Sequence, residues 1–328
     1  MISAPACLCL VAWAAGLALA VTPSQALAGD LAFVTNQTGD DLSVVDVDSG
    51  KLRTTLAIGG KPAGVATTPA DPRVYVTSPD SKTLTVIDST TLAITRRITL
   101  TGGPLGVAVH PTGAPVYVAD WYGTRLLEIN PDTGHISRIF QTGRSPSGVA
   151  VTPDGRRILT ADRDSDQVSI LDAASGRRLS VVATGRAPFG VTIDRAGARA
   201  YTANVKSDTV TVIDIAAGRA IATVKVGTRP YVVALANGRG FVTNQYDDSV
   251  SVFDLSGLSE IARIDVGEYP EGIMATSDGR RVLVSCWFSN SLTVIDSDSL
   301  KVVGEIPVGD GPRAFGTFLR PTPPHLRP

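Results

Sequence analysis

Short runs in which apolar and polar residues alternate recur along almost the whole chain, and turns separate them. Leu84–Asp88, with the sequence L-T-V-I-D, is one such run, and Leu126–Asn130 stands 42 residues later. Alternation with a period of two is the pattern of a half-buried β-strand. The segments between runs, such as Asn130–Gly134 (N-P-D-T-G), are rich in Asp, Gly, Thr, Ser and Pro, which favour turns. The pattern predicts strands and tight turns throughout, with no amphipathic helix.

Two series of residues recur at a nearly constant interval. Seven prolines, five of which begin a P-x-G run, stand 42 residues apart in every step but one, which is 40. They are Pro62, Pro104, Pro146, Pro188, Pro230, Pro270 and Pro312. The alternating runs close at Asp46, Asp88, Asn130, Asp172, Asp214, Asp254 and Asp296. Each interval holds four strand-like runs, which is the content of one blade of a β-propeller. The sequence therefore predicts an all-β fold, a seven-bladed β-propeller with four antiparallel strands per blade.

The two ends of the chain fit a closed ring. The first run, at residues 31–36, has no proline strand before it, and the last, Ala314–Leu319, follows Pro312 with no run after it. We expect this C-terminal strand to join the N-terminal blade, because closure removes the open sheet edges that promote aggregation. The expected organisation is one propeller domain over residues 29–320 and a disordered, proline-rich tail over residues 321–328.

The first 28 residues have the features of a secretory signal peptide. Residues 7–21 are apolar but too few for a comfortable membrane span, and Ala26-Leu27-Ala28 forms a small-x-small cleavage site. We expect cleavage after Ala28, a periplasmic or secreted protein, and no integral membrane segment in the cleaved chain. No Lys or Arg precedes the apolar run, so an uncleaved anchor stays open as the alternative.

Three motifs carry a family resemblance. Phe33-Val34-Thr35-Asn36, Tyr75-Val76-Thr77-Ser78 and Phe241-Val242-Thr243-Asn244, with the V-I-D run and the V-G-x-x-P-x-G-V segment after them, resemble the signature of the YVTN-repeat β-propellers. The YncE-like periplasmic proteins belong to that group. The resemblance extends over residues 31–319 and implies a WD40-like repeat fold. It also implies relatives as different as a single-stranded-DNA-binding protein, subunits of quinoprotein amine dehydrogenases and surface-layer proteins, so function has to be argued from a site.

The sequence contains no recognisable catalytic set. Its three histidines fall in unrelated places, no Gly-x-Ser-x-Gly motif occurs, and Cys286 is the single cysteine after the signal. We expect no catalytic residues, no metal and no cofactor, although an enzymatic role stays open. A run with alternating carboxylates, Asp162–Asp166, resembles a calcium loop but lacks the Gly and distal Glu of the EF-hand, and a solvated turn is the simpler interpretation.

Large aromatic residues and arginines gather in the loops at one end of the blades. Alternate loops of an antiparallel sheet lie at the same end, so the loop after the first strand and the loop before the proline strand share a face. The candidate ligand-binding residues on that face are Trp121, Tyr122, Arg163, Phe189, Arg229, Tyr231, Tyr246, Tyr269, Glu271, Trp287 and Arg313. Stacking and guanidinium groups suit a planar or anionic ligand. The alternative is that these aromatics fill the central channel.

The residue after each repeat proline varies in an ordered way. It is small or aliphatic at Ala63, Leu105 and Ser147, then becomes Phe189, Tyr231, Glu271 and Arg313. The fourth to seventh copies therefore form the arc where we expect a ligand or partner to bind.

The hypothesis that follows is an exported, non-catalytic binding or scaffold protein with a protein or small-molecule partner in the periplasm. The alternatives are an accessory subunit of a quinoprotein-type dehydrogenase or a lactonase-like hydrolase, and single-stranded DNA binding. The net charge of −1 and the acidic residues on the same face weigh against nucleic acid as the partner.

Overall fold

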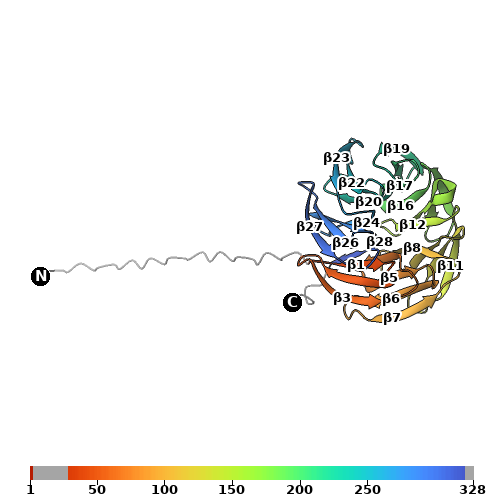
Figure 1. Ribbon diagram of the computed structural model, residues 1–328, viewed down its shortest axis with the longest axis horizontal. Coiled ribbons are helices and arrows are strands. Elements are labelled where there is room, and N and C mark those ends of the chain that lie inside the picture. Colours follow the sequence, from red (N-terminus) through yellow and green to blue (C-terminus); the bar gives the residue numbers. More distant parts are fainter. Residues whose placement is uncertain (3–28, 322–328) are drawn as a thin grey trace.

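The structure is a computed structural model that describes residues 1–2 and 29–321, and it contains a ring of seven β-sheets. The sheets follow one another around a central axis in chain order, so that the first and last strands of the ring lie side by side (Figure 1). We number the sheets as blades one to seven from the N-terminus. The predicted seven-bladed propeller with four antiparallel strands per blade is confirmed.

Blade one contains β1 (Asp30–Asn36), β2 (Asp41–Asp46), β3 (Lys51–Ala57) and β29 (Leu319–Pro321). Blade two contains β4 (Gly64–Thr68), β5 (Asp71–Ser78), β6 (Thr83–Asp88) and β7 (Ile94–Thr99), with β28 (Phe315–Thr317) beside β4. Blade three contains β8 (Pro104–Val109), β9 (Val116–Asp120), β10 (Arg125–Ile129) and β11 (Ile136–Gln141). Blade four contains β12 (Pro146–Val151), β13 (Arg157–Asp162), β14 (Gln167–Asp172) and β15 (Arg178–Ala183).

Blade five contains β16 (Pro188–Ile193), β17 (Arg199–Asn204), β18 (Thr209–Asp214) and β19 (Arg219–Lys225). Blade six contains β20 (Pro230–Ala236), β21 (Arg239–Asn244), β22 (Ser249–Asp254) and β23 (Glu260–Asp265). Blade seven contains β24 (Pro270–Ala275), β25 (Arg281–Cys286), β26 (Ser291–Asp296) and β27 (Lys301–Pro307). Within the described residues the single helical segment is one 3-10 turn, η1 (Arg163–Ser165), and no helix there is long and apolar enough to cross a bilayer.

The ring closes through the C-terminal strand, as the sequence predicts, but that strand is divided in two. Residues 319–321 pair with β1 in the antiparallel sense, and Phe315–Thr317 pair with β4 in the parallel sense. The seventh proline copy reads P-R-A-F-G-T, so its glycine stands two positions later than in five of the other copies, and the fifth copy, P-Y-V-V-A, has none. Gly316 has a φ of 123°, a conformation open to glycine, and this lets the chain pass from one blade to the next.

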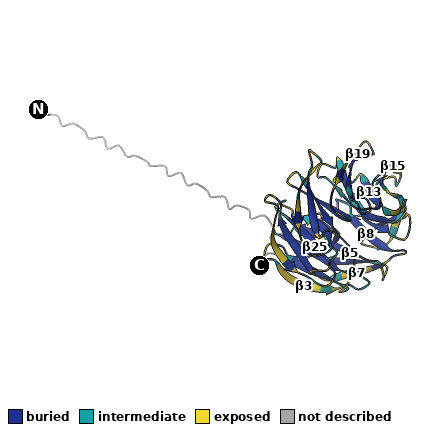
Figure 2. Ribbon diagram, turned by 45° about the horizontal axis from the view of Figure 1, so that its top comes forward, coloured by how far each residue is buried: buried dark blue, intermediate teal, exposed yellow. Residues whose placement is uncertain are grey.

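Burial decreases from the axis to the rim. The three inner strands are largely buried because both faces of each sheet pack against neighbouring blades, whereas outer strands such as β3 and β27 are exposed (Figure 2). The large buried residues include the first position of the YVTN-like motif, at Phe33, Tyr75, Tyr117, Tyr201 and Phe241. The hydrophobic core is therefore a set of layers between blades.

The remaining motif positions connect strands by hydrogen bonds. The hydroxyl of Thr77 donates to the Leu105 carbonyl of the next blade over 2.5 Å, and the Asn244 amide donates to the Ser251 hydroxyl over 2.9 Å. Cys286 occupies the Asn position in blade seven, fully buried beside Thr293, with Sγ 3.4 Å from its Oγ1. The motif residues build blades, and Cys286 is a member of that set.

The repeat glycine is required by crowding at the axis. A Cβ atom on Gly106 would lie 1.8 Å from the Ser147 carbonyl oxygen of the next inner strand, and one on Gly272 would lie 2.3 Å from that of Ala314. Both contacts are with backbone, which cannot move aside without moving a strand. The inner strands are therefore closest together just after their prolines.

Candidate functional site at the loop face

The end of the ring where the inner strands begin, here called the loop face, is held in shape by a repeated backbone feature. In five of the seven copies a non-glycine residue before the proline has a positive φ, including Arg229 at 57° and Tyr269 at 55°. Their backbone N–H groups donate to Asp208 Oδ1 over 2.9 Å and to Asp248 Oδ1 over 2.8 Å. These hydrogen bonds offset a conformation that costs an L-residue about 1 to 2 kcal/mol. The loops thereby present Arg229 and Tyr269 in fixed positions.

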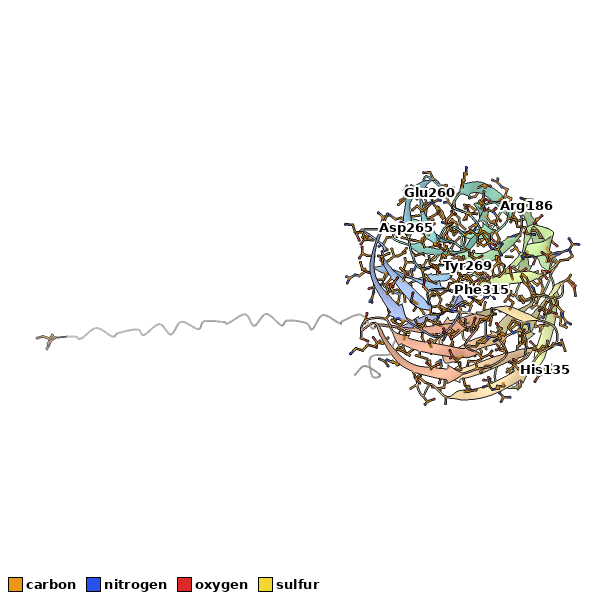
Figure 3. The ribbon with its side chains drawn as sticks, viewed as in Figure 1. His135, Arg186, Glu260, Asp265, Tyr269 and Phe315 are labelled. Atoms are coloured by element: carbon orange, nitrogen blue, oxygen red, sulfur yellow. The ribbon has the colours of Figure 1, made fainter. Side chains whose placement is uncertain are left out.

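Three aromatic rings close the axis beneath the loops. Phe189 and Tyr231 stack with ring centroids 4.1 Å apart, and Phe315 lies 4.9 Å from Phe189. Phe189 and Tyr231 are each only 4% exposed, and Phe315 lies near the centre of the ring (Figure 3). Trp121 packs edge-on against Phe189 at 5.7 Å and is partly buried. We call Phe189, Tyr231 and Phe315 the axial plug, because their rings fill the central channel. Phe189 and Tyr231, which are two of the candidate ligand-binding residues, are therefore covered.

A buried polar chain runs beside the axial plug. Arg229 Nε donates to Gln245 Oε1 over 2.8 Å, and Gln245 Nε2 donates to Glu271 Oε1 over 2.9 Å. Arg313 Nε lies 3.2 Å from Glu271 Oε2, as an ion pair without hydrogen-bond alignment. The Arg313 guanidinium also donates to the Tyr231 hydroxyl and, over 3.0 Å, to Gln37 Oε1.

Burial sets the electrostatics of this chain. It raises the pKa of Glu271 above its ordinary value, against the opposing charges of Arg313 and Arg229 and the Gln245 hydrogen bond. It also raises the pKa of the Tyr231 hydroxyl, so that this group stays a neutral donor or acceptor. Each charged group points at a protein partner, and the chain therefore ties the sixth, seventh and first blades together across the axis.

Three aromatic side chains form a row on the exposed part of the loop face. Tyr246 and Tyr269 lie 6.0 Å apart, and Tyr269 and Phe288 lie 5.2 Å apart, measured between ring centroids. Tyr246 is 61% exposed and Phe288 is 65% exposed. The Arg229 guanidinium lies 4.8 Å from the centre of the Tyr246 ring, within the range of a cation–π interaction. We call Tyr246, Tyr269 and Phe288 the aromatic ridge.

The other candidate residues lie around these two groups. Trp287 is partly buried, and its backbone N–H donates to the Tyr269 carbonyl over 3.1 Å, which joins its loop to the aromatic ridge. Arg163 lies 5.4 Å from the Trp121 ring and pairs with Asp164. Tyr122 is 74% exposed and covers Gly103, apart from both groups. The eleven candidates thus form three groups. Phe189, Tyr231, Glu271 and Arg313 lie covered at the axis, with Trp121 and Arg163 beside Phe189. Arg229, Tyr246, Tyr269 and Trp287 lie at the loops of blades six and seven, and Tyr122 stands apart.

The alternating carboxylates of Asp162–Asp166 have separate tasks. Asp162 Oδ2 is buried and accepts from the Gly143 N–H over 2.8 Å, whereas Asp166 Oδ1 accepts from the Ala187 N–H over 2.7 Å. Asp164 accepts from the Ser145 hydroxyl over 2.7 Å. In the part of the chain that the structure describes, no three His, Cys, Asp or Glu side chains form a group that could hold a metal ion.

Sequence reasoning missed two glutamines that join the candidates. Gln37 and Gln245 directly follow Asn36 and Asn244, the last positions of their motifs, and both reach the buried polar chain. The same position holds Trp121, Arg163 and Trp287 in other blades. Position relative to the motif, rather than residue type, is the signal that finds them.

A cavity at the opposite end of the axis was also missed. It has a volume of about 650 Å³ and extends from the axial plug, where Phe315 and Gly148 line it, to the exposed turn residues Pro69, Pro153 and Arg195. Its wall is built from the second halves of the inner strands, which supply mainly Val and Ala. We call this end the turn face and the space the axial cavity.

These features define a closed β-propeller with a rigid, aromatic loop face. The chain belongs to the YNCE-like beta-propeller family, whose model matches residues 3–321. No curated protein matches the chain.

Three solved structures illustrate how widely this fold occurs. The Kuenenia stuttgartiensis hydrazine synthase matches with a TM-score of 0.74 at 20% identity, covering 86% of this chain and 99% of that chain. A functionally unknown protein from Desulfotomaculum acetoxidans matches with a TM-score of 0.74 at 17% identity, covering 87% and 99%. The dihydro-heme d1 dehydrogenase NirN, in complex with DHE, matches with a TM-score of 0.66 at 16% identity, covering 92% and 78%. At these identities the likeness concerns the fold alone.

Proposed function

We propose that this protein is an exported, non-catalytic binding protein that holds a partner protein against the aromatic ridge. The observation that carries the proposal is the exposure of Tyr246 and Phe288 in a contiguous row with Tyr269. Contiguous exposed aromatics on a soluble domain mark interaction surfaces, and Tyr, Trp and Arg are the residues that dominate binding energy at such surfaces.

Rigidity of the surroundings supports the proposal. The ridge loops are joined by the Trp287 and Phe288 backbone N–H groups, which donate to the carbonyls of Tyr269 and Glu268 over 3.1 and 3.3 Å. Arg229 is held between Gln245 and the Tyr246 ring. A surface that is ordered before binding loses little conformational entropy on binding, so its contacts contribute more to affinity.

The surroundings also favour a protein over a nucleic acid. Asp247, Asp248 and Glu268 lie next to the ridge residues in the chain, and they are exposed or half-exposed. Phosphate groups close to these carboxylates would be repelled, whereas a partner protein can present a mixture of charges.

The test is site-specific photocrosslinking in the native host. Replacing Phe288 by the photoreactive p-benzoylphenylalanine places the crosslinker on the ridge, and replacing Ile139 places it on β11, where that side chain is 49% exposed on the rim. We expect a discrete crosslinked species from position 288 that is missing from position 139. Adding Tyr246→Ala and Tyr269→Ala should remove most of that species.

Equal crosslinking at both positions, or none at position 288, would contradict the proposal. The identity of the crosslinked protein also separates the versions of the function. A redox enzyme as the partner supports an accessory subunit, and a partner without bound cofactor supports a scaffold. Tyr231, which is buried in the axial plug, is unsuitable for this test because its replacement would destabilise the ring.

A further inference from the structure

A carboxylate is fixed beside the middle residue of the aromatic ridge. Asp248 Oδ1 accepts from the Tyr269 backbone N–H over 2.8 Å, and Asp248 follows Tyr246 by two residues in its own loop. This hydrogen bond holds the carboxylate between the loops that carry the first two rings of the ridge. Asp248 is exposed, and in the part of the chain that the structure describes its Oδ2 has neither a hydrogen-bond partner nor an ion pair.

The same repeat position in blade one shows what such a carboxylate can bind. Asp40 Oδ1 accepts from the backbone N–H of Lys61, the residue before a repeat proline, over 2.7 Å. Asp40 Oδ2 also pairs with the side chain of this lysine, with Nζ 3.3 Å away. In blade six Tyr269 stands before the proline in place of a lysine, so this position supplies no cation to the second oxygen of Asp248.

The arginines of the neighbouring loops and strands are engaged by other groups. Arg263 pairs with Asp247 over 3.3 Å. Arg229 Nε donates to Gln245 Oε1 over 2.8 Å, and its guanidinium lies 4.8 Å from the centre of the Tyr246 ring. Arg229 also shows that one ring of the ridge already holds a guanidinium against its face.

The other two rings of the ridge are suited to the same contact. Tyr269 and Phe288 are inclined to each other by 61°, and Phe288 is 65% exposed. A cation within about 6 Å of the centre of a ring is attracted to the face of that ring. The planar guanidinium of arginine stacks on aromatic rings and also pairs with carboxylates, whereas an ammonium group stacks less well. Exposed rings beside the Asp248 carboxylate therefore favour a guanidinium.

We propose that the partner presents an arginine side chain to the aromatic ridge, where its guanidinium contacts the exposed rings and pairs with Asp248 Oδ2. This inference rests on the partner binding proposed above and specifies the chemistry of the contact. Asp247 and Glu268 lie on the same loops, so the local charge attracts a cation.

The first experiment uses N-acetylarginine amide as the probe. The full chain, labelled with 3-fluorotyrosine, is titrated with this compound and followed by fluorine NMR, and Tyr246→Phe and Tyr269→Phe assign the resonances of the ridge. We expect these resonances to shift with the arginine compound and to stay in place with N-acetylcitrulline amide, which has a similar shape and no charge. N-acetyllysine amide should bind more weakly than the arginine compound.

Asp248→Asn tests the carboxylate and leaves its loop intact, because the amide oxygen can still accept from the Tyr269 N–H. This variant should bind N-acetylarginine amide about fivefold more weakly, as expected for the loss of one exposed ion pair. Asp166→Asn is the matched control. Asp166 has the same repeat position in blade four, where its Oδ1 accepts from the Ala187 N–H over 2.7 Å, and its replacement should not change binding.

Photocrosslinking from position 288 in the native host separates this inference from the proposed function. Asp248→Asn should lower the yield of the crosslinked species about fivefold, and Asp166→Asn should not. An undiminished yield in Asp248→Asn would overturn the arginine contact and leave partner binding standing, whereas no crosslink in the otherwise wild-type protein would overturn partner binding itself. Equal binding of the arginine and citrulline compounds, or equal binding of the arginine compound by the two Asn variants, would also overturn the inference.

Discussion

The two ends of the propeller axis are built from the same inner strands and have opposite properties. At the loop face a different residue follows the proline of each copy, and Phe189, Tyr231, Glu271 and Arg313 meet near the axis. At the turn face the strands continue with similar small apolar residues, and the axis opens into a cavity of about 650 Å³. Large side chains at the crowded ends of the strands fill the axis, and small side chains at the spread ends cannot. One set of repeated inner strands can thus close the central axis at one end and leave it open at the other.

The largest expected effect comes from removing the axial plug. Phe189→Ala deletes a ring that contacts Trp121, Tyr231 and Phe315, and we expect the free energy of unfolding to fall by about 3 to 5 kcal/mol, because a cavity forms at a packed site. The matched variant Phe288→Ala removes the same side chain from the exposed ridge and should change stability by less than about 0.5 kcal/mol. Urea denaturation of both proteins checks the difference, and similar losses would mean that the plug is not tightly packed.

A smaller effect tests why the strands are crowded at one end. Gly106→Val should destabilise the protein by about 2 to 3 kcal/mol, because its Cβ would meet the Ser147 carbonyl oxygen of the next strand at 1.8 Å. Gly304→Val is the control, since β27 is exposed there and a Cβ would contact nothing within 4 Å. Thermal unfolding followed by circular dichroism compares the two, and an unchanged midpoint for Gly106→Val would contradict backbone crowding at the axis.

The smallest effect concerns the buried charge beside the plug. Burial raises the pKa of Glu271 above its ordinary 4.5, so the folded protein holds that proton more tightly than the unfolded chain does. The corresponding stability is fully present below pH 4.5 and is lost as the pH rises through the pKa of the folded state. The wild-type protein should therefore lose stability relative to Glu271→Gln as the pH increases.

Urea denaturation of both proteins at several pH values measures this difference directly. Other titrating groups cancel in the comparison, because the two chains differ at one position. A difference that stays constant with pH would show that Arg313 and Arg229 compensate the burial of the carboxylate fully.

The repeat pattern was sufficient to predict the fold because it acts on every blade. The period of the prolines, the alternating runs and the YVTN-like motif each specify local strands and their neighbours, and all seven blades follow from them. The seam departs from the pattern, because the seventh copy has Ala314 where most copies have glycine. There, the displaced Gly316 divides the closing strand between β1 and β4, and a rule drawn from the other copies predicts an undivided strand.

The sequence was sufficient to predict which face of the propeller carries the candidate residues, but not which of their side chains are accessible to solvent. Phe189 and Tyr246 are both assigned to the loop face by their position in the repeat, yet the first is 4% exposed and the second 61%. The difference depends on distance from the axis, which is a property of the closed ring. The role of the candidate residues in binding stays a prediction, as do export and signal cleavage at Ala28, which lies outside the described residues.

The amino-acid sequence by itself determined the blades, their number and which residues face each end, because strand pairing and turns depend on near neighbours in the chain. The tertiary structure alone decided which of those residues are covered and where space is left. Closure of the ring brings residues as distant as Tyr231 and Arg313 into contact, and it leaves Asp30 beside an apolar cavity. These outcomes depend on how seven blades share one axis, and no single repeat contains that information.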